Sequence, residues 1–443
     1  VCVPLSASGV RGTQNQYEFL FNRIEGVLMS GYASLKENLV FNALTQGVNA
    51  FLPLLIQYLI VRRLDLVDIG SLNVLFSIQA LFALVVAAAN LHLLVVTSRE
   101  GETDDYVVVS NGTVFGLLCA IPSTLLFLVV ALTSEALSAR IGETAVIVAV
   151  AFSILVAPLG NSYYFQARLL NRQMFARRVV SRFALLVGIL LFIEKPDDAV
   201  AYGVIFSLVM VLEYFLAYAR VHRLVDLGSV TVARQKEILF GSMKYLHFNL
   251  TYGVLPHYAV VLGVGRVGEQ YFAEFSVLVK IVNLVTGFIT SSVMVLYPFK
   301  NSRGATPEAG QLDKRALLWT ALVALLATLG LILVSKVIYI LMLNRPDPVM
   351  AKEFWVLAFY VPVHAVFNYY MFNVFIYEGR HRFVILLNSA TLAGFALLVV
   401  LSGMLGWGLS LSFILISTAA AALMVVVVVA ATRDSRYVGA SKT

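Results

Sequence analysis

The chain has 443 residues, of which 60% are hydrophobic and only 13% are charged, and its mean hydropathy is +0.87. Soluble domains carry roughly 45–50% apolar and about 25% charged residues, so a single water-soluble core and a disordered chain are both excluded. The net charge of +7 is therefore interpreted through membrane orientation and not as a nucleic-acid site. The composition predicts an all-α protein that crosses a membrane many times.

Apolar runs long enough to cross a bilayer recur along the whole chain. Such a helix needs about 20 largely apolar residues. The runs lie at 38–61, 72–96, 107–132, 144–167, 178–193, 199–219, 245–264, 271–297, 316–341, 354–376, 383–405 and 407–430. The fifth is short, and the amphipathic stretch from Gln173 predicts that its helix begins earlier. We therefore expect about twelve transmembrane helices.

A polar stretch at 220–244 divides these helices into two sets of six. We expect one bundle over 38–219 and another over 245–430, with tails at 1–37 and 431–443. Two matched halves are typical of transporters whose site lies between them.

Lys and Arg are concentrated in alternate loops. With the N-terminus inside, 22 of the 32 fall in inside loops and tails, and 7 in outside loops. Because cytoplasmic loops are enriched in these cations, we expect both termini and the 220–244 linker in the cytoplasm. Met29 is an ordinary starting residue, so it stays open whether residues 1–28 belong to the native protein.

Polar side chains interrupt the apolar runs on single helix faces. In the first run Asn42, Gln46 and Asn49 are spaced four and three residues apart, which places them on one face. Asn249 has a comparable place in the seventh run. Hydrogen bonds between helices would explain any one of these residues. As a set, they predict a hydrated cavity between the two halves.

Charged residues inside the apolar runs are the strongest indication of a functional site. An ionised side chain at mid-helix costs about 2.5–3.5 kcal/mol on insertion scales. Lys280 lies well inside the eighth run, with Asn283 one turn further on, and we expect both to face the cavity. Arg182 and Glu213 lie at similar depths in adjacent helices, either as an ion pair or as guides for an anionic group. Glu274 is expected at the outer interface, and both glutamates are candidates for ion coupling or ion pairing.

The sequence carries no pattern for catalysis, metal or cofactor binding. Gly263, Gly265 and Gly268 spell G-x-G-x-x-G, but they end a membrane helix and no strand precedes them, so a dinucleotide site is excluded. Cys2 and Cys119 form neither a disulfide framework nor a zinc-like cluster. We expect no enzyme, no cofactor and no metal.

Short motifs stand at the ends of the predicted helices. They are Leu52-Pro53-Leu54-Leu55, Arg62-Arg63-Leu64, Ile69-Gly70, Phe165-Gln166-Ala167, Gly268-Glu269-Gln270-Tyr271, Tyr297-Pro298, Glu378-Gly379-Arg380-His381 and Gly406-Trp407-Gly408. With Arg182 and Lys280, this series resembles the Wzx-type polysaccharide flippases of the multidrug/oligosaccharidyl-lipid/polysaccharide (MOP) exporter superfamily. That family often has glycine where this chain has Ala167.

The resemblance covers about residues 38–430 and implies two six-helix bundles of MATE-like fold that work by alternating access. It implies transfer of an undecaprenyl-pyrophosphate-linked oligosaccharide across a bacterial inner membrane. Membrane lipid, a polysaccharide polymerase and a chain-length regulator would be its partners.

Within that resemblance, the cations would bind the anionic head group and the amides would bind sugar. The cations are Lys280, Arg62, Arg63 and Arg182, and the amides are Asn42, Gln46, Asn49, Asn249 and Asn283. The glycan, the coupling ion and the oligomeric state stay open.

Two other functions compete with this interpretation. A multidrug antiporter of the same superfamily would need an intramembrane carboxylate, for which only Glu213 and Glu274 are available. A membrane O-antigen polymerase or ligase would present a large outside loop, and all the outside loops here are short.

Overall fold

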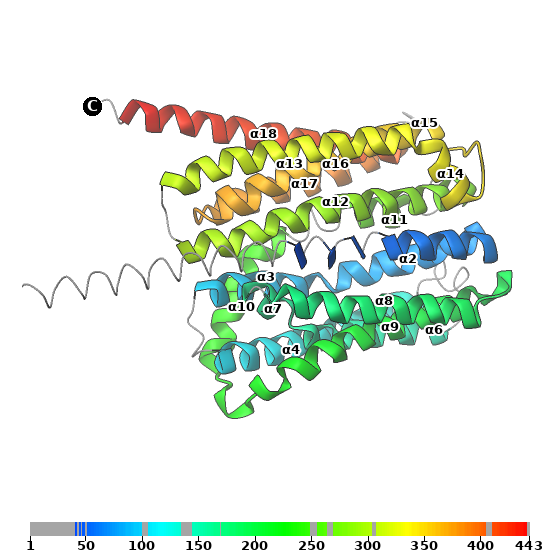
Figure 1. Ribbon diagram of the computed structural model, residues 1–443, viewed down its shortest axis with the longest axis horizontal. Helices are drawn as coiled ribbons and strands as arrows, with labels where there is room; N and C mark the ends of the chain where they lie inside the picture. Colours follow the sequence, from blue (N-terminus) through cyan, green and yellow to red (C-terminus); the bar gives the residue numbers. More distant parts are fainter. Residues whose placement is uncertain are drawn as a thin grey trace, which may run out of the picture.

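The computed structural model describes residues 40–41, 44–45, 47–48, 51–99, 105–133, 144–168, 170–248, 255–263, 269–303, 307–404 and 410–440. Within these ranges the chain is almost entirely helical and contains no strand. The long helices run side by side in two groups (Figure 1). The expected all-α class with two helical lobes is confirmed.

The first half of the chain forms the N-lobe. Residues 51–63 are helical, and Asp65 then caps a new helix by accepting a hydrogen bond from the Val67 amide at 3.0 Å. The helices that follow are α2 (Leu66–Phe82), α3 (Leu84–Arg99), α4 (Asp105–Thr133), α6 (Thr144–Val156), α7 (Ser162–Ala167), α8 (Asn171–Phe192) and α9 (Ala199–Val221). Two short 3₁₀ turns, η2 (Ala157–Gly160) and η3 (Pro196–Asp198), precede α7 and α9.

The second half forms the C-lobe. Its elements are α11 (Leu255–Gly263), α12 (Glu269–Arg303), α13 (Pro307–Leu333), α14 (Ser335–Leu343), α15 (Ala351–Ala358), α16 (Tyr360–Tyr370), the π-helix η7 (Met371–Ile376), α17 (His381–Met404) and α18 (Leu411–Ala440). Between the lobes, α10 (Val232–Phe248) lies across one end of the molecule and contacts both α3 and α17 (Figure 1). We call this the α10 end and the opposite one the α14 end.

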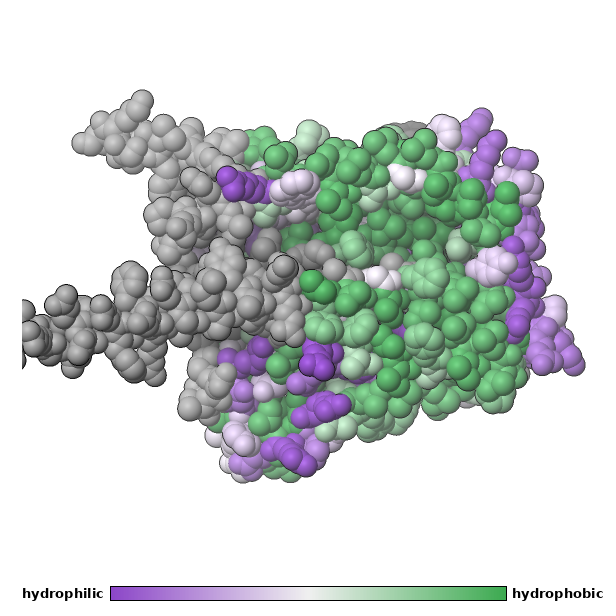
Figure 2. All heavy atoms as spheres, viewed as in Figure 1, coloured by the Kyte–Doolittle hydropathy of each residue, from purple (hydrophilic) through white to green (hydrophobic). Residues whose placement is uncertain are grey.

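Seven of the described helical segments are long and apolar enough to cross a membrane. They are Asp105–Thr133, Thr144–Ala167, Pro196–Leu224, Glu269–Thr290, Arg315–Leu333, His381–Ser402 and Leu411–Ala430. Figure 2 shows the matching apolar belt, with polar side chains gathered at the α14 end. The chain is therefore a multi-pass membrane protein.

Several other expected spans are built from shorter helices. The run 72–96 is α2 and α3 with a break at Ala83, and 354–376 is α15, α16 and η7. The break at Phe359 precedes Pro362, whose ring is tolerated only in the first turn of a helix. Broken helices are accepted in membranes where they line a cavity or pack against protein.

The predicted boundaries shift most around the polar segments. Helix α8 begins at Asn171, two residues before the start predicted at Gln173, so Arg177 and Arg178 lie inside a helix. The expected linker 220–244 holds two 3₁₀ turns, η4 (His222–Leu224) and η5 (Leu227–Ser229), and most of α10. Asn111 of α4 bonds this linker at the Ser229 carbonyl (3.1 Å) and the Thr231 amide (3.2 Å).

The two lobes meet closely along α2 and α12. A Cβ atom added at Gly70 would lie 3.1 Å from the Cα of Ala273, so any larger residue would push the two helices apart by a few tenths of an ångström. One turn along each helix, Asn73 donates a hydrogen bond to Ser276 across the interface at 3.0 Å. This contact joins the two lobes on the side of the interlobe space nearer the α14 end.

Candidate functional site

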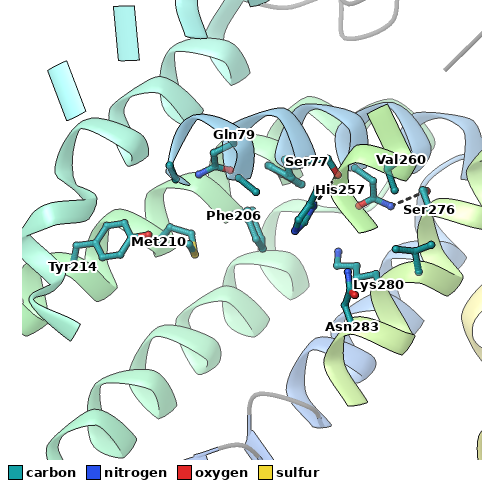
Figure 3. Close-up of a pocket in the computed structure, with 15 residues that line it drawn as sticks. Ser77, Gln79, Phe206, Met210, Tyr214, His257, Val260, Ser276, Lys280 and Asn283 are labelled. Carbon is teal, nitrogen blue, oxygen red and sulfur yellow. Dashed lines mark hydrogen bonds between the residues drawn. The ribbon is translucent and has the colours of Figure 1, made fainter. Parts of the chain in front are cut away.

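A cavity of about 300 Å³, the interlobe cavity, lies between the lobes. Its wall is formed by α2 and α9 of the N-lobe and by α11 and α12 of the C-lobe (Figure 3). The polar side chains in this wall are Asn73, Ser77, Gln79, Tyr214, His257, Ser276, Lys280 and Asn283. The wall contains no Asp or Glu among the residues described.

Lys280 and Asn283 stand one turn apart on α12 and both face this cavity (Figure 3). The Lys280 ammonium points toward the α11 side of the cavity, where His257 lies. No described side chain forms an ion pair with Lys280, and the nearby charge that acts on it is the positive Arg182. The interlobe cavity is therefore positively charged and lined by hydrogen-bonding groups.

Two hydrogen bonds join the lobes in the cavity wall. His257 Nδ1 and Ser77 Oγ lie 3.2 Å apart, and Asn73 Nδ2 lies 3.0 Å from Ser276 Oγ. Sequence reasoning did not single out Asn73 and Ser77. Their spacing of four residues within an apolar run is the signal that could have identified this polar face of α2.

A second cavity of about 370 Å³, the arginine cavity, lies within the N-lobe. Its wall includes Arg177, Arg178, Arg182, Glu213 and Tyr214. It shares Ala83, Met210 and Tyr214 with the interlobe cavity, so the two adjoin. The break between α2 and α3 stands at this junction, which accounts for a helix break at membrane depth.

Glu213 pairs with Arg178, and the described residues show no ion pair between Glu213 and Arg182, one of the two roles that the sequence left open for them. The Arg178 Nε lies 3.6 Å from Glu213 Oε1, and Ser181 donates a hydrogen bond to Oε2 at 3.2 Å. Positions 178 and 182 are one helical turn apart and face the same way. Their depth in the helix therefore could not predict which of the two arginines pairs with Glu213. The Nε of Arg182 is buried without a hydrogen-bond partner in the described chain.

Arg177 is held by η2, the turn that precedes α7. One guanidinium nitrogen donates to the Gly160 carbonyl at 3.0 Å, and the group stacks on Phe165 at 4.6 Å. The adjacent Asn161 has a φ of 40°, so the turn is tight. Arg177 therefore shapes the wall and also adds charge to it.

Arg62 and Arg63, predicted as head-group ligands, line neither cavity. Arg63 donates to the carbonyls of Ile189 and Ile193 at 3.2 and 2.6 Å, where α8 ends. Arg62 stacks on Tyr58 at 3.7 Å and reaches the Leu341 carbonyl at 3.3 Å. Both guanidinium groups join helix ends, and the structure does not bring them to Lys280.

Glu274 lies near the start of α12, and its side chain is fully buried by protein. Its carboxylate accepts hydrogen bonds from the Met350 amide at 3.1 Å and from Gln270 at 3.2 Å. Arg345 approaches it at 3.8 Å. Arg345 and Met350, in the segment between α14 and α15, therefore cover this turn of α12, and the expected position at the outer interface stays a prediction. The remaining predicted site residues, Asn42, Gln46, Asn49 and Asn249, lie outside the described residues.

No protein-family model and no curated protein sequence matches the chain. Its fold is similar to that of solved transporters. An inward-facing multidrug-resistance MATE transporter of the MOP superfamily has a TM-score of 0.65 at 14% identity, covering 90% of this chain and 95% of that one. The eukaryotic MATE transporter AtDTX14 has a TM-score of 0.59 at 15% identity, covering 90% and 96%.

A third similar structure is a MOP superfamily transporter from Pyrococcus furiosus, described as having a binding pocket of reverse polarity that suggests a different function. Its TM-score is 0.58 at 13% identity, with 91% and 95% of the two chains covered. The similarity extends over nearly the whole length of every chain compared. The chain therefore has the fold of the MATE and MOP superfamily transporters.

Proposed function

We propose that this protein is an alternating-access transporter that moves the anionic head group of a lipid-linked oligosaccharide across a bacterial inner membrane. Its substrate would be an undecaprenyl-pyrophosphate-linked repeat unit, carried from the cytoplasmic leaflet to the outer one. Both termini would be cytoplasmic, and the product would pass to a polysaccharide polymerase and its chain-length regulator. The two-lobed fold supports transport, because solved transporters of this fold include inward- and outward-facing conformations.

The observation that carries the proposal is the charge of the interlobe cavity. Lys280 is in its wall without a neutralising Asp or Glu among the described residues. A cation in a low-dielectric site favours a negative ligand and disfavours a positive one. Asn283, Gln79 and Ser77 offer hydrogen bonds of the kind that sugar hydroxyls require.

A multidrug antiporter of the same superfamily is the second candidate, and the fold supports it equally. A cationic drug in the interlobe cavity would be repelled by Lys280. The carboxylate of the adjoining cavity, Glu213, is already paired with Arg178. The reverse-polarity neighbour from Pyrococcus furiosus indicates that one fold accommodates pockets of either sign. Pocket charge therefore favours the anionic substrate.

The test is translocation in proteoliposomes. Purified protein is reconstituted with a polyprenyl-diphosphate-linked oligosaccharide, and a glycosidase added outside reports how much sugar has crossed. We expect time-dependent exposure of sugar that falls at least tenfold in Lys280→Gln and persists in Lys280→Arg. Lys336→Gln, which removes an exposed charge on α14, serves as the matched control. Transport of a cationic dye without any exposure of sugar would refute the flippase function.

A further inference from the structure

The arginine cavity holds more positive charge than its surroundings neutralise. Three guanidinium groups line it, and Glu213 is its one carboxylate among the described residues. Glu213 is already bound by Arg178 and Ser181. Arg177 donates a hydrogen bond from one nitrogen to the Gly160 carbonyl, which carries no full charge and so does not neutralise it. Two positive charges therefore face the cavity without a carboxylate.

The hydrogen-bond donors of these arginines also indicate that the cavity has too few negative or accepting groups. The Nε atoms of both Arg177 and Arg182 are buried and have no hydrogen-bond partner in the described part of the chain. A buried donor without a partner costs about 1–3 kcal/mol, and more when the group is charged. Lys280, in the adjoining cavity, adds repulsion to Arg182. A negative group entering the cavity would offset this repulsion and supply the missing hydrogen-bond acceptors.

The geometry of the cluster suits a compact polyanion. Arg178 and Arg182 are one turn apart on α8 and Arg177 lies beside them, so their planar groups converge on one space. Guanidinium groups bind phosphate with paired hydrogen bonds. A space of about 370 Å³ accommodates a phosphate or diphosphate together with water.

We propose that the arginine cavity is a binding site for a phosphate or diphosphate group, separate from the interlobe cavity. Arg182 is its principal ligand, Arg178 and Arg177 complete it, and Glu213 limits its charge. The two cavities share Ala83, Met210 and Tyr214. One amphiphile would then place its phosphates between the arginines and Lys280, and its sugar beside Asn283 and Gln79 of the interlobe cavity. This division of the head group rests on the proposed function, but the anion site itself does not.

Binding to the full-length protein in lipid nanodiscs tests the site. The probes are inorganic pyrophosphate and a polyprenyl diphosphate, each measured by isothermal titration calorimetry. We expect Arg182→Gln to weaken pyrophosphate binding at least tenfold, about 1.4 kcal/mol. Arg182→Lys should bind pyrophosphate more weakly than the native chain and more tightly than Arg182→Gln. Lysine keeps the positive charge but loses the paired N–H donors of the guanidinium group. Lys336→Gln, the surface control, should stay within twofold of the native chain.

Glu213→Gln gives the readout that a purely structural role would not produce. Removing this carboxylate leaves Arg178 free and raises the positive charge of the cavity, so pyrophosphate should bind more tightly, by threefold or more. If these residues only held α8 to α9, substitutions of Arg182 and Glu213 would change stability and leave pyrophosphate binding as it is. Opposite signs for the two substitutions support the site, and unchanged binding in both overturns it.

The two probes separate the sources of the phosphate. Equal losses for pyrophosphate and polyprenyl diphosphate in Arg182→Gln support a site that takes the phosphates of an amphiphile. A loss confined to pyrophosphate supports a site for a soluble anion. If neither probe is affected, the site is refuted even if sugar translocation persists, so its failure is distinct from failure of the transport function.

Discussion

Both lobes bury charged side chains, but the two clusters differ in charge balance and surroundings. In the C-lobe, Glu274 is fully buried and its carboxylate is occupied by an amide, a side-chain donor and Arg345. In the N-lobe, three arginines line a cavity in which Glu213, the one carboxylate among the described residues, pairs with Arg178. A buried charge whose hydrogen-bond and ion-pair partners are all present stabilises the fold. A cluster of like charges beside a cavity, with too few opposite charges to neutralise it, is suited to binding a ligand. Charge balance, more than burial, distinguishes the two.

The largest effect is expected at the C-lobe cluster. Glu274→Ala removes the acceptor for the Met350 amide and Gln270 inside protein, so it should lower the free energy of unfolding by about 3 kcal/mol. Thermal unfolding in detergent measures this loss. Glu213→Ala is the matched N-lobe variant and should cost less than half as much, because cavity water can solvate Arg178. Equal losses in the two variants would contradict the comparison.

Within the arginine cluster, the structural and the ligand-facing roles should separate. Arg177→Gln loses the bond to Gly160 and the stacking on Phe165. It should destabilise the protein by about 1.5 kcal/mol. Arg182→Gln removes an uncompensated charge and should leave the unfolding temperature unchanged or slightly higher. Urea or thermal unfolding of both variants checks this, and a larger loss in Arg182→Gln would assign the structural role to Arg182.

The smallest effect is expected where the lobes touch. Asn73→Ala removes one hydrogen bond to Ser276, and such bonds between membrane helices contribute about 0.6 kcal/mol. The variant should unfold within 1 kcal/mol of the native chain, while a thiol-reactive probe added from the α14 side should label a cysteine introduced at Val279, in the cavity wall, two- to threefold faster. Unchanged access would show that this bond does not help to close the α14 end.

The sequence predicts the helical class and several helices well, because apolar runs in a membrane leave few alternatives. The runs 107–132 and 199–219 lie within α4 and α9 almost to the residue. Lys280 and Asn283 share a cavity wall because residues three apart on one helix face the same way. Local spacing was enough for both inferences.

Features that depend on long-range packing could not be predicted. Nothing in the residues around Ala83 marks a helix break, since neither proline nor glycine is present there. The burial of Glu274 depends on a loop 70 or more residues further along the chain. The sequence predicts a helix from Gln173 but not that Arg177 and Arg178 line a cavity, because that cavity depends on packing against η2 and α9.

Anomalous diffraction from crystals soaked in tungstate, a heavy tetrahedral oxyanion, would test most directly whether the N-lobe's excess positive charge is balanced by a bound anion. The account predicts an anomalous peak inside the arginine cavity, within hydrogen-bonding distance of the Arg182 guanidinium, that disappears in Arg182→Gln. Peaks at surface lysines and arginines alone, with only water among the three arginines, would contradict it.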